Sequence, residues 1–445
     1  MKHLRYIVSF VLCTLSLCTW SQDFARMGER SIMGTARYVG MSGAMSAIGA
    51  DPSATLDNVA GLGMYRRAEI LVSFDYMADR AWQVGVPDTK GRARLFMAPQ
   101  AALVLSFPTN KVSGIQYHNV QISYQRIHAF NRALRGTAEN GPSLGALFAT
   151  TTADLGVPYC SDRLNAAERM DLFESGYVNE YAFDWAMNIS NRWYVGAGLR
   201  INSFSMSSEG KYQEWFDHYN TKGDMFYNYS QTRVLFNGVG ASLAVGAIYR
   251  PAQWFRLGFG LETPSVSTFR TSTTGYFEAQ ADSVAPGSSS APNQRYEVSG
   301  FHMPLHLSTS AAFQITNYAL IAFQYDYFHQ PGEIDRHSLR AGVEVVPYPG
   351  VYLNAGYAYE SPFRKSYPLV AMDESLNRQD TYFLRTHRTQ YISGAVGYRG
   401  RYLLVQAAYQ YRMQRVKLWA HEAVNAPYDI NADTHRVVVT ICWHR

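Results

Sequence analysis

The sequence predicts an all-β fold: a transmembrane antiparallel β-barrel of about 14 strands, with an N-terminal hatch, or plug, inside its lumen. Three observations lead to this fold class. Apolar and polar residues alternate with a period of two from about residue 68 onward. Most alternating segments reach about ten residues, the length of a tilted membrane-spanning strand. Their connections alternate between tight turns and long polar segments, as in outer-membrane barrels.

The composition agrees with a barrel and excludes several other classes. Only 17% of the 445 residues are charged, whereas soluble proteins are about a quarter charged. The 14% of aromatic residues, among them 32 Tyr, exclude a disordered chain. No run of roughly 20 apolar residues could form a transmembrane helix. A dispersed net charge of +5 disfavours nucleic-acid binding, so composition leaves a secreted β protein and a barrel.

Residues 1–21 have the pattern of a secretory signal peptide. Lys2 and Arg5 precede a short apolar run, and small residues follow at the expected cleavage positions. We expect cleavage after Ser21 and a mature protein in the outer membrane of a Gram-negative cell. Two of the four cysteines leave with the signal. Cys160 and Cys442 remain, and we expect unpaired thiols because their spacing implies no disulfide framework.

Residues 22–67 lack the alternation and are dense in small residues, which allow tight turns and close backbone packing. A barrel of about 14 strands is too wide for its own side chains to fill. We therefore predict that residues 22–67 form a hatch inside the lumen. A flexible leader would instead be rich in Ser and Pro.

Residues 68–445 are predicted to form the barrel. On each strand one parity is apolar, such as Phe183 and Trp185, and the other is small or polar, such as Asp184. The predicted strand cores are residues 68–78, 98–107, 118–129, 177–190, 192–204, 236–249, 253–263, 303–315, 317–328, 335–346, 350–360, 388–398, 401–412 and 434–443. Sandwich strands are usually about five or six residues long, so this strand length favours the barrel.

The connections sort into two kinds. Tight turns are predicted at Asn191, 250–253, 316–317, 347–349 and 399–400. Long polar segments are predicted at 79–97, 130–176, 205–235, 264–302, 361–387 and 413–433. Short turns at one end and long loops at the other are typical of membrane barrels, and an even strand number places both chain ends on the short-turn side.

The small-residue segment resembles the hatch of the FadL/TodX family of outer-membrane transporters. The resemblance rests on Gly34–Ala44, Asp51–Ala54 and Asn58–Leu62, with support from Gly238–Pro251 and the strand count. The family usually has Asn-Pro-Ala where this chain has Asn-Val-Ala. The missing Pro removes a fixed backbone angle, so the local hatch structure is expected to differ. The overall sequence pattern is similar to that of homologues from Bacteroidetes.

This resemblance implies a fourteen-stranded, plugged barrel that takes up long-chain fatty acids or other hydrophobic compounds and releases them through a lateral opening in the wall. It implies no enzyme activity, and the sequence has no phosphate loop, CxxC, HExxH or GxSxG motif. We expect no cofactor, no metal and a monomer. The expected partners are outer-membrane lipid and a hydrophobic small-molecule ligand.

Two groups of residues are candidates for binding this ligand. In the hatch and lumen they are Arg37, Tyr38, Met41, Asn58, Leu62, Arg200 and Arg340. In the external loop after the third strand they are Leu147, Phe148, Leu164, Leu172 and Phe173, the last three within a predicted helix over 161–173. The apolar stripe of this helix would serve either a ligand groove or packing over the barrel mouth.

Other interpretations stay open. Arg37 would either neutralise a substrate carboxylate or pair with a lumen acid such as Asp184 or Glu344, and we favour the pairing because a buried charge must be paired. A haem or haemin receptor would use His302 or His306, which lie about 13 Å apart along a strand and so cannot both bind one iron. A third alternative is a non-transport role as an assembly or secretion partner through the external loops.

Overall fold

The computed structural model describes residues 28–109, 111–141, 165–216, 226–281, 284–301, 303–330, 335–362, 383–420 and 426–444. The predicted signal peptide, Cys160, His302, Leu147, Phe148 and Leu164 therefore lie outside the described residues. The strands are β1 Glu69–Gln83, β2 Gly91–Pro108, β3 Ile115–Ala138, β4 Ala167–Ile189, β5 Trp193–Phe216, β6 Phe226–Ala252, β7 Phe255–Glu262, β8 Val266–Ala281, β9 Val284–Phe301, β10 Leu305–Thr316, β11 Ala319–His329, β12 Arg336–Tyr348, β13 Val351–Glu360, β14 Phe383–Arg399, β15 Leu403–Trp419 and β16 Tyr428–His444.

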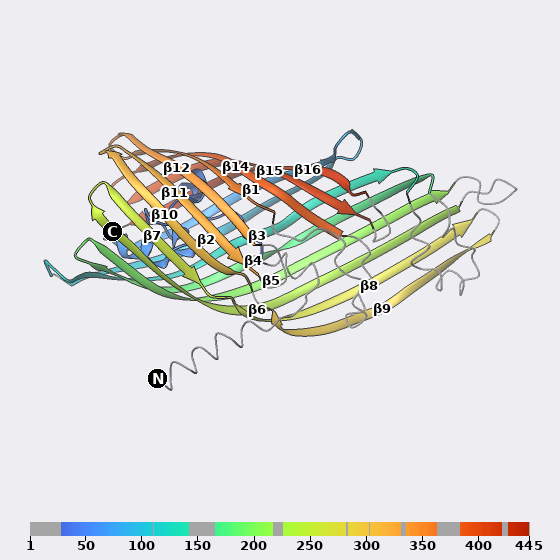
Figure 1. Cartoon of the computed structure of the whole chain (residues 1–445), viewed down its shortest axis with the longest axis horizontal. Helices are drawn as coiled ribbons and strands as arrows, with labels where there is room; N and C mark the ends of the chain where they lie inside the picture. The colour runs from blue at the N-terminus through green and yellow to red at the C-terminus, as the bar shows by residue number, and fades with distance from the viewer. Residues whose placement is uncertain are drawn as a thin grey trace.

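These strands close into an antiparallel barrel with fourteen positions around the ring, as predicted (Figure 1). β1 pairs with β16, each ring strand pairs with the next in the chain, and β7 pairs directly with β10. The remaining two strands, β8 and β9, form a hairpin outside this ring, and β8 continues the pairing of β6 beyond the end of β7. The described residues thus contain sixteen strands, of which fourteen form the ring, and the chain is divided between β7 and β8 and between β9 and β10, where the hairpin leaves it.

Proline explains both divisions. Pro264 separates β7 from β8, and Pro304 separates β9 from β10. Proline has no N–H for the ladder and is therefore found at strand ends and edges. The Ser265 hydroxyl instead accepts a hydrogen bond from the Met303 backbone N–H at 3.2 Å, which ties the two interruptions together.

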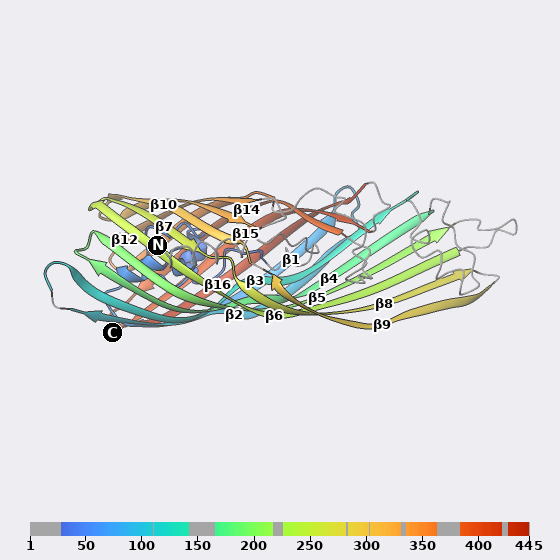
Figure 2. The ribbon, with the colours of Figure 1, turned by 60° about the horizontal axis from the view of Figure 1, so that its bottom comes forward.

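The outer ends of the strands differ most from the sequence predictions. The segment predicted as a loop over 264–302 contains the β8–β9 hairpin, and β5 and β6 extend to 24 and 27 residues. Figures 1 and 2 show β5, β6, β8 and β9 projecting well beyond the ends of β10–β12. The predicted helix over 161–173 is wrong, because β4 begins at Ala167. Leu172 and Phe173 are therefore strand residues, Leu172 buried in the lumen and Phe173 exposed outside.

The two faces of the wall follow the predicted alternation. Exposed apolar side chains form an outward band, including Leu105, Ile122, Phe183, Leu243 and Val405. The alternate positions face the lumen and are small, polar or charged. No helix among the described residues is long and apolar enough to cross a membrane. Cys442 is a free, buried thiol.

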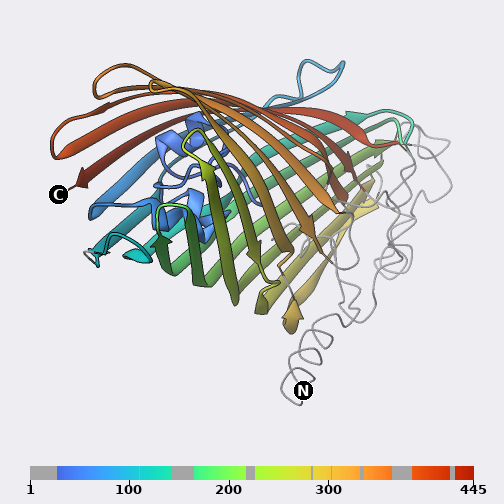
Figure 3. The ribbon, with the colours of Figure 1, turned by 60° about the vertical axis from the view of Figure 1, so that its left-hand side comes forward.

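The segment before β1 is compact and lies inside the lumen, at the end of the barrel that holds the C-terminus (Figure 3). It contains one short helix, α3 (Ala36–Gly40), and two 3-10 turns, η1 (Ala54–Leu56) and η2 (Val59–Met64). Nearly all of its described residues are buried. We call residues 28–67 the hatch.

Candidate functional site

Side-chain caps hold the hatch in shape. Thr35 begins α3, and its hydroxyl accepts a hydrogen bond from the Tyr38 backbone N–H at 3.1 Å and donates one to Asp51 at 2.8 Å. Asn58 caps η2 through the Ala60 N–H at 3.1 Å. Burial raises the pKa of Asp51 above its ordinary value, although the nearby Arg37 acts in the opposite direction.

Arg37 projects from α3 and forms a bidentate ion pair with Glu344 of β12. The Nε and Nη2 groups donate to the carboxylate at 2.6 and 2.8 Å. Burial is the largest single influence and lowers the pKa of Arg37, but the charge and hydrogen bonds of Glu344, together with the charge of Asp51, raise it above its ordinary value, so the guanidinium stays charged. The structural pairing favoured from the sequence is therefore the one that forms.

The other two predicted lumen cations are also paired. Arg340 donates to the Tyr38 hydroxyl and to Asp57 of the hatch, both at 3.0 Å, and lies 3.1 Å from Asp326. Arg200 is fully buried, pairs with Asp184 and with Glu180 at 3.1 Å, and donates to the hatch carbonyl of Thr55 at 3.0 Å. These side chains fasten the hatch to the wall, and their charges are already balanced by carboxylates.

Arg30, near the start of the described hatch, makes a third connection. Its guanidinium pairs with Glu262 of β7 at 2.5 Å and Glu180 of β4 at 3.5 Å. Burial lowers the pKa of Arg30, whereas these two carboxylates together raise it above the ordinary value. The same guanidinium lies 3.5 Å from Nδ1 of His306. Sequence reasoning missed Arg30 because its partners lie far away in the chain.

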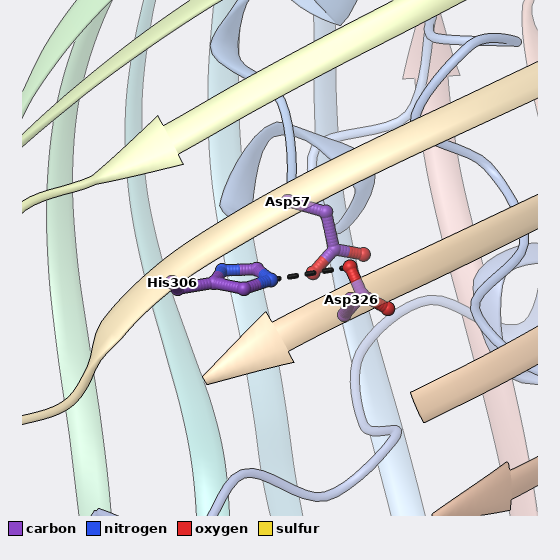
Figure 4. A group of neighbouring side chains, drawn as sticks. All are labelled: Asp57, His306 and Asp326. Atoms are coloured by element: carbon purple, nitrogen blue, oxygen red, sulfur yellow. Dashed lines mark hydrogen bonds and ion pairs between the residues drawn. The ribbon is translucent and has the colours of Figure 1, made fainter. Parts of the chain in front are cut away.

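His306, Asp326 and Asp57 meet at the boundary of hatch and wall (Figure 4). They offer three ligand atoms within 4.8 Å of one another, a spacing that a metal ion could use. The arrangement fits a hydrogen-bond network better. Arg30 can only donate to Nδ1, so Nε2 carries the proton and donates to Asp326 at 3.1 Å. His306 is also buried and stacked on Phe328, which leaves no ring nitrogen for a haem iron.

The remaining predicted hatch residues make packing contacts. Met41 is fully buried against β12 and β13, where Gly342 and Gly356 admit its backbone. Leu62 is buried with Val104, and its carbonyl accepts a hydrogen bond from Asn119 at 2.8 Å. Asn58 donates from its side chain to Ala247 of β6 at 3.2 Å.

The hydrogen-bond ladder between β2 and β3 is interrupted. The two strands pair from Pro108 and Tyr117 only as far as Gln100 and Gln125. Beyond this point β2 stays paired with β1 as far as Gly91, while β3 stays paired with β4 as far as Ala138. Two irregularities lie where β2 and β3 stop pairing. Pro99 lacks the N–H that a ladder needs, and β3 has a bulge between Arg126 and His128 that bends the strand.

The interruption is bounded at its far end as well. The side chain of Gln83, at the end of β1, exchanges two hydrogen bonds with the backbone of Thr137 on β3, at 2.7 and 2.8 Å. Gly91 of β2 also lies against Ala133 of β3. We call the unpaired stretch between residues 91–99 of β2 and 126–133 of β3 the window.

The hatch reaches the inner side of the window. The backbone N–H of Ser31 donates to the carbonyl of Ile127, the bulge residue, at 2.8 Å. The Ser31 hydroxyl lies 2.9 Å from Nδ1 of His128, and Gln125 donates to the Met33 carbonyl at 2.7 Å. Ser31 and Met33 of the hatch therefore supply hydrogen-bond partners to β3 close to the point where β2 stops pairing with it.

Buried apolar side chains extend from the window across the lumen side of β3–β6. This inner apolar cluster consists of Leu56, Ile127, Phe130, Val178, Phe204, Met206, Val234, Phe236, Phe269 and Met303. It connects the bulge at Ile127 with Leu56 of the hatch and Met303 at the second wall interruption. A second, outer apolar cluster contains Ala81, Leu134, Met170, Leu172, Tyr212, Leu384, Val416, Leu418, Ala420, Tyr428, Ile430 and Ala432. Of the two predicted loop residues that the structure describes, Leu172 belongs to the outer cluster and Phe173 to neither.

This architecture was compared with known protein families, sequences and solved structures. No family model and no curated sequence matches the chain. Solved structures do: a FadL homologue of Pseudomonas aeruginosa at 13% identity and a TM-score of 0.53, covering 94% of this chain and 99% of that one. The Pseudomonas putida toluene transporter TodX matches at 10% identity and 0.55, covering 93% and 98%. The Ralstonia pickettii toluene transporter TbuX matches at 14% and 0.53, covering 93% and 98%.

The fold and the internal hatch define an outer-membrane-type β-barrel with a plugged lumen. More particularly, the chain has the fold of the FadL and TodX group of hydrophobic-compound transporters along almost its whole length. The resemblance that the hatch motifs indicate is thus confirmed at the level of the fold.

Proposed function

We propose that this protein is an outer-membrane channel for the passive uptake of hydrophobic or amphipathic small molecules, with long-chain fatty acids as one substrate class. In this proposal the ligand leaves sideways through the window, and the hatch controls its exit. The observation that carries the proposal is the window itself, which joins a buried apolar cluster to the lipid-facing band. The solved structures with this fold include two toluene transporters, which supports a hydrophobic cargo.

The two apolar clusters provide successive binding places. Leu172 and Tyr428 belong to the outer cluster, while Phe130 and Phe204 belong to the inner cluster beside the window. An apolar molecule gains roughly 25 cal/mol for each Å² of surface that it removes from water. Passage from the outer to the inner cluster and then into lipid keeps this gain throughout and needs no energy source.

The hatch makes a straight route along the barrel axis costly. Such a route requires breaking the buried pairs Arg37–Glu344 and Arg340–Asp57. Removing one partner of a buried pair costs about 3–5 kcal/mol, and several such pairs hold the hatch. A lateral exit requires that Ser31 move away from Ile127 and His128, which breaks hydrogen bonds of about 1 kcal/mol each, while the neighbouring buried pair of Arg30 with Glu262 stays in place.

Closing the window tests the proposal. Deleting Ile127 removes the bulge, and Pro99→Thr restores a backbone N–H, so β2 and β3 can pair beyond Gln100. We expect the double variant to reach the membrane as a folded, heat-modifiable barrel. Uptake of a radiolabelled long-chain fatty acid and of toluene, measured in cells that lack other channels, should fall to the level of cells without the protein.

Pro264→Thr is the matched control, since it changes the proline of the other wall interruption and leaves the window as it is. Uptake by this control should equal that of the unmodified protein. If a crystal structure showed the window closed while uptake continued, lateral release would be refuted. If the unmodified protein took up neither compound and bound no apolar ligand, the channel function itself would be lost.

A further inference from the structure

Four arginines surround the window on its outer face. Arg92 and Arg94 are exposed on β2, Arg80 is exposed on the adjoining β1, and Arg126 lies on β3 across the window. The Arg126 guanidinium reaches toward β2, where it lies 3.4 Å from the sulfur of Met97. We call these four residues the arginine rim.

Acidic side chains lie near the rim without forming a direct ion pair: Asp433 is opposite Arg80 in the β1–β16 ladder, and the charge of Asp75 on β1 acts on Arg126. Among the described residues, none of its arginines has a carboxylate oxygen within 4.0 Å. Arg126 donates to the neutral Asn179 side chain at 3.0 Å and to the Tyr124 hydroxyl at 3.4 Å, and it lies over the Tyr177 ring at 4.8 Å. The lumen cations Arg37, Arg200 and Arg340 differ, since each has a carboxylate partner.

The register brings like charges together. Arg80 and Arg92 lie directly opposite each other in the β1–β2 ladder, an arrangement that is destabilising unless a counter-ion separates the charges. The acid opposite Arg80 on its other side, Asp433, accepts a hydrogen bond from the Tyr411 hydroxyl at 2.6 Å. An anion from outside the chain would relieve the repulsion.

The position of the rim in the membrane follows from the exposed apolar band on the same strands. The exposed apolar band on β1 and β2 ends at Tyr76 and Phe96, which are paired. On β3 it ends at Ile122, followed by the half-buried Tyr124, whose ring contacts Tyr181 at 5.5 Å. Aromatic side chains mark the boundary between hydrocarbon and headgroups. Arg94 and Arg126 each follow two residues beyond this boundary, so their charges lie at the level of the lipid headgroups.

We propose that the arginine rim binds the anionic headgroup of a resident outer-leaflet lipid, whose acyl chains then cover the mouth of the window. Arginine recognises phosphate oxygens through its planar set of donors, and Arg92, Arg94 and Arg126 surround the window from both sides. The bound lipid seals the opening until a ligand displaces its chains. This inference adds a partner to the proposed lateral exit, but the lipid site itself exists whether or not transport occurs.

Native mass spectrometry of the full-length protein in a neutral detergent tests the site. The probes are phosphatidylglycerol and phosphatidylcholine with the same acyl chains. Each arginine near a membrane surface favours an anionic lipid about five-fold, so three should give roughly a hundred-fold preference. In the triple variant Arg92→Gln, Arg94→Gln and Arg126→Gln this preference should vanish, while the triple Lys variant should keep part of it.

The matched control removes three exposed arginines at or near the short-turn end: Arg67→Gln, Arg192→Gln and Arg401→Gln. It has the same net charge as the rim variant and should keep the preference for phosphatidylglycerol. Equal binding of both lipids by the unmodified protein would overturn the proposal, as would loss of the preference in the control. So would a rim variant that retains the lipid but takes up only anionic ligands more slowly, since the headgroup would then be that of the cargo. Lipid binding is measured without transport, so its failure is distinct from failure of the channel function.

Discussion

At the scale of single residues, buried charge decides how the hatch is held. Arg37 and Glu344 form a bidentate pair between α3 and β12, and both side chains are largely buried. A guanidinium in such surroundings needs a partner whatever the cargo. A lumen arginine in a plugged barrel is therefore weak grounds for a ligand site, and the same reasoning applies to Arg200 and Arg340.

The Arg37–Glu344 pair can be tested by a mutant cycle. Arg37→Met or Glu344→Leu alone leaves a buried charge without its partner and should lower the free energy of unfolding by about 3–5 kcal/mol. The double variant should recover most of this loss, because neither charge remains. Urea titration in lipid vesicles, followed by tryptophan fluorescence, measures the effect. Additive losses in the double variant would show that the pair is not coupled.

Lumen glycines let the hatch backbone approach the wall, and Gly356 gives a second residue-scale prediction. A Cβ at this position would lie 2.4 Å from the carbonyl carbon of Met41, whereas at Gly394 on the adjacent strand the nearest atom would be 3.5 Å away. We expect Gly356→Ala to displace the hatch and increase protease cleavage within it. Gly394→Ala should behave as the unmodified protein, and equal cleavage of both variants would contradict this account.

The sequence identified hatch residues but not the connections among the site residues. Arg37, Arg200 and Arg340 are recognisable as charges on lumen positions, yet their partners depend on strand register. Arg126 and Arg92 carry no local signal either, because the window exists only where β2 and β3 part. Pro99 inside a strand pattern is the one signal in the sequence that points to this place.

At the scale of elements, each of the fourteen predicted strand cores corresponds to a ring strand, because an apolar outer face repeats with a period of two. The outer extensions were missed for the same reason. Beyond Ile201 the outward positions of β5 are Ser203, Ser205 and Ser207, so the outer face is no longer apolar and the segment resembles a polar loop in sequence. The helix predicted over 161–173 failed because Met170 and Leu172 also share one face of a strand.

The β8–β9 hairpin should be dispensable for barrel closure. Glu262 of β7 and His306 of β10 are direct partners, so the ring is complete without the hairpin. Replacing residues 264–304 with Asn-Gly should still give a folded barrel by heat-modifiability on gels. Removing β14 and β15, which belong to the ring, is the comparison, and this variant should fail to fold. Failure of the hairpin deletion as well would mean that the outer strands are needed for closure.

At the scale of the whole molecule, the apolar band predicts how the barrel sits in a bilayer. Trp185, Trp193 and Trp443 are exposed at the short-turn end of the band, whereas Trp215 lies near the far end of β5. In variants that keep one tryptophan each, lipids brominated on the acyl chain should quench the first three and leave Trp215 almost unchanged. Equal quenching of Trp215 would place the long strands inside the membrane.

The unequal strand lengths give the barrel a slanted rim. At about 3.3 Å per residue, β6 runs for about 90 Å and β13 for about 33 Å. The described strands are therefore long on the side of β4–β6 and short on the side of β10–β13, so the outer end of the barrel is oblique. The two sides of the barrel are therefore not equivalent in the plane of the membrane, and a neighbouring molecule meets a different surface on each side.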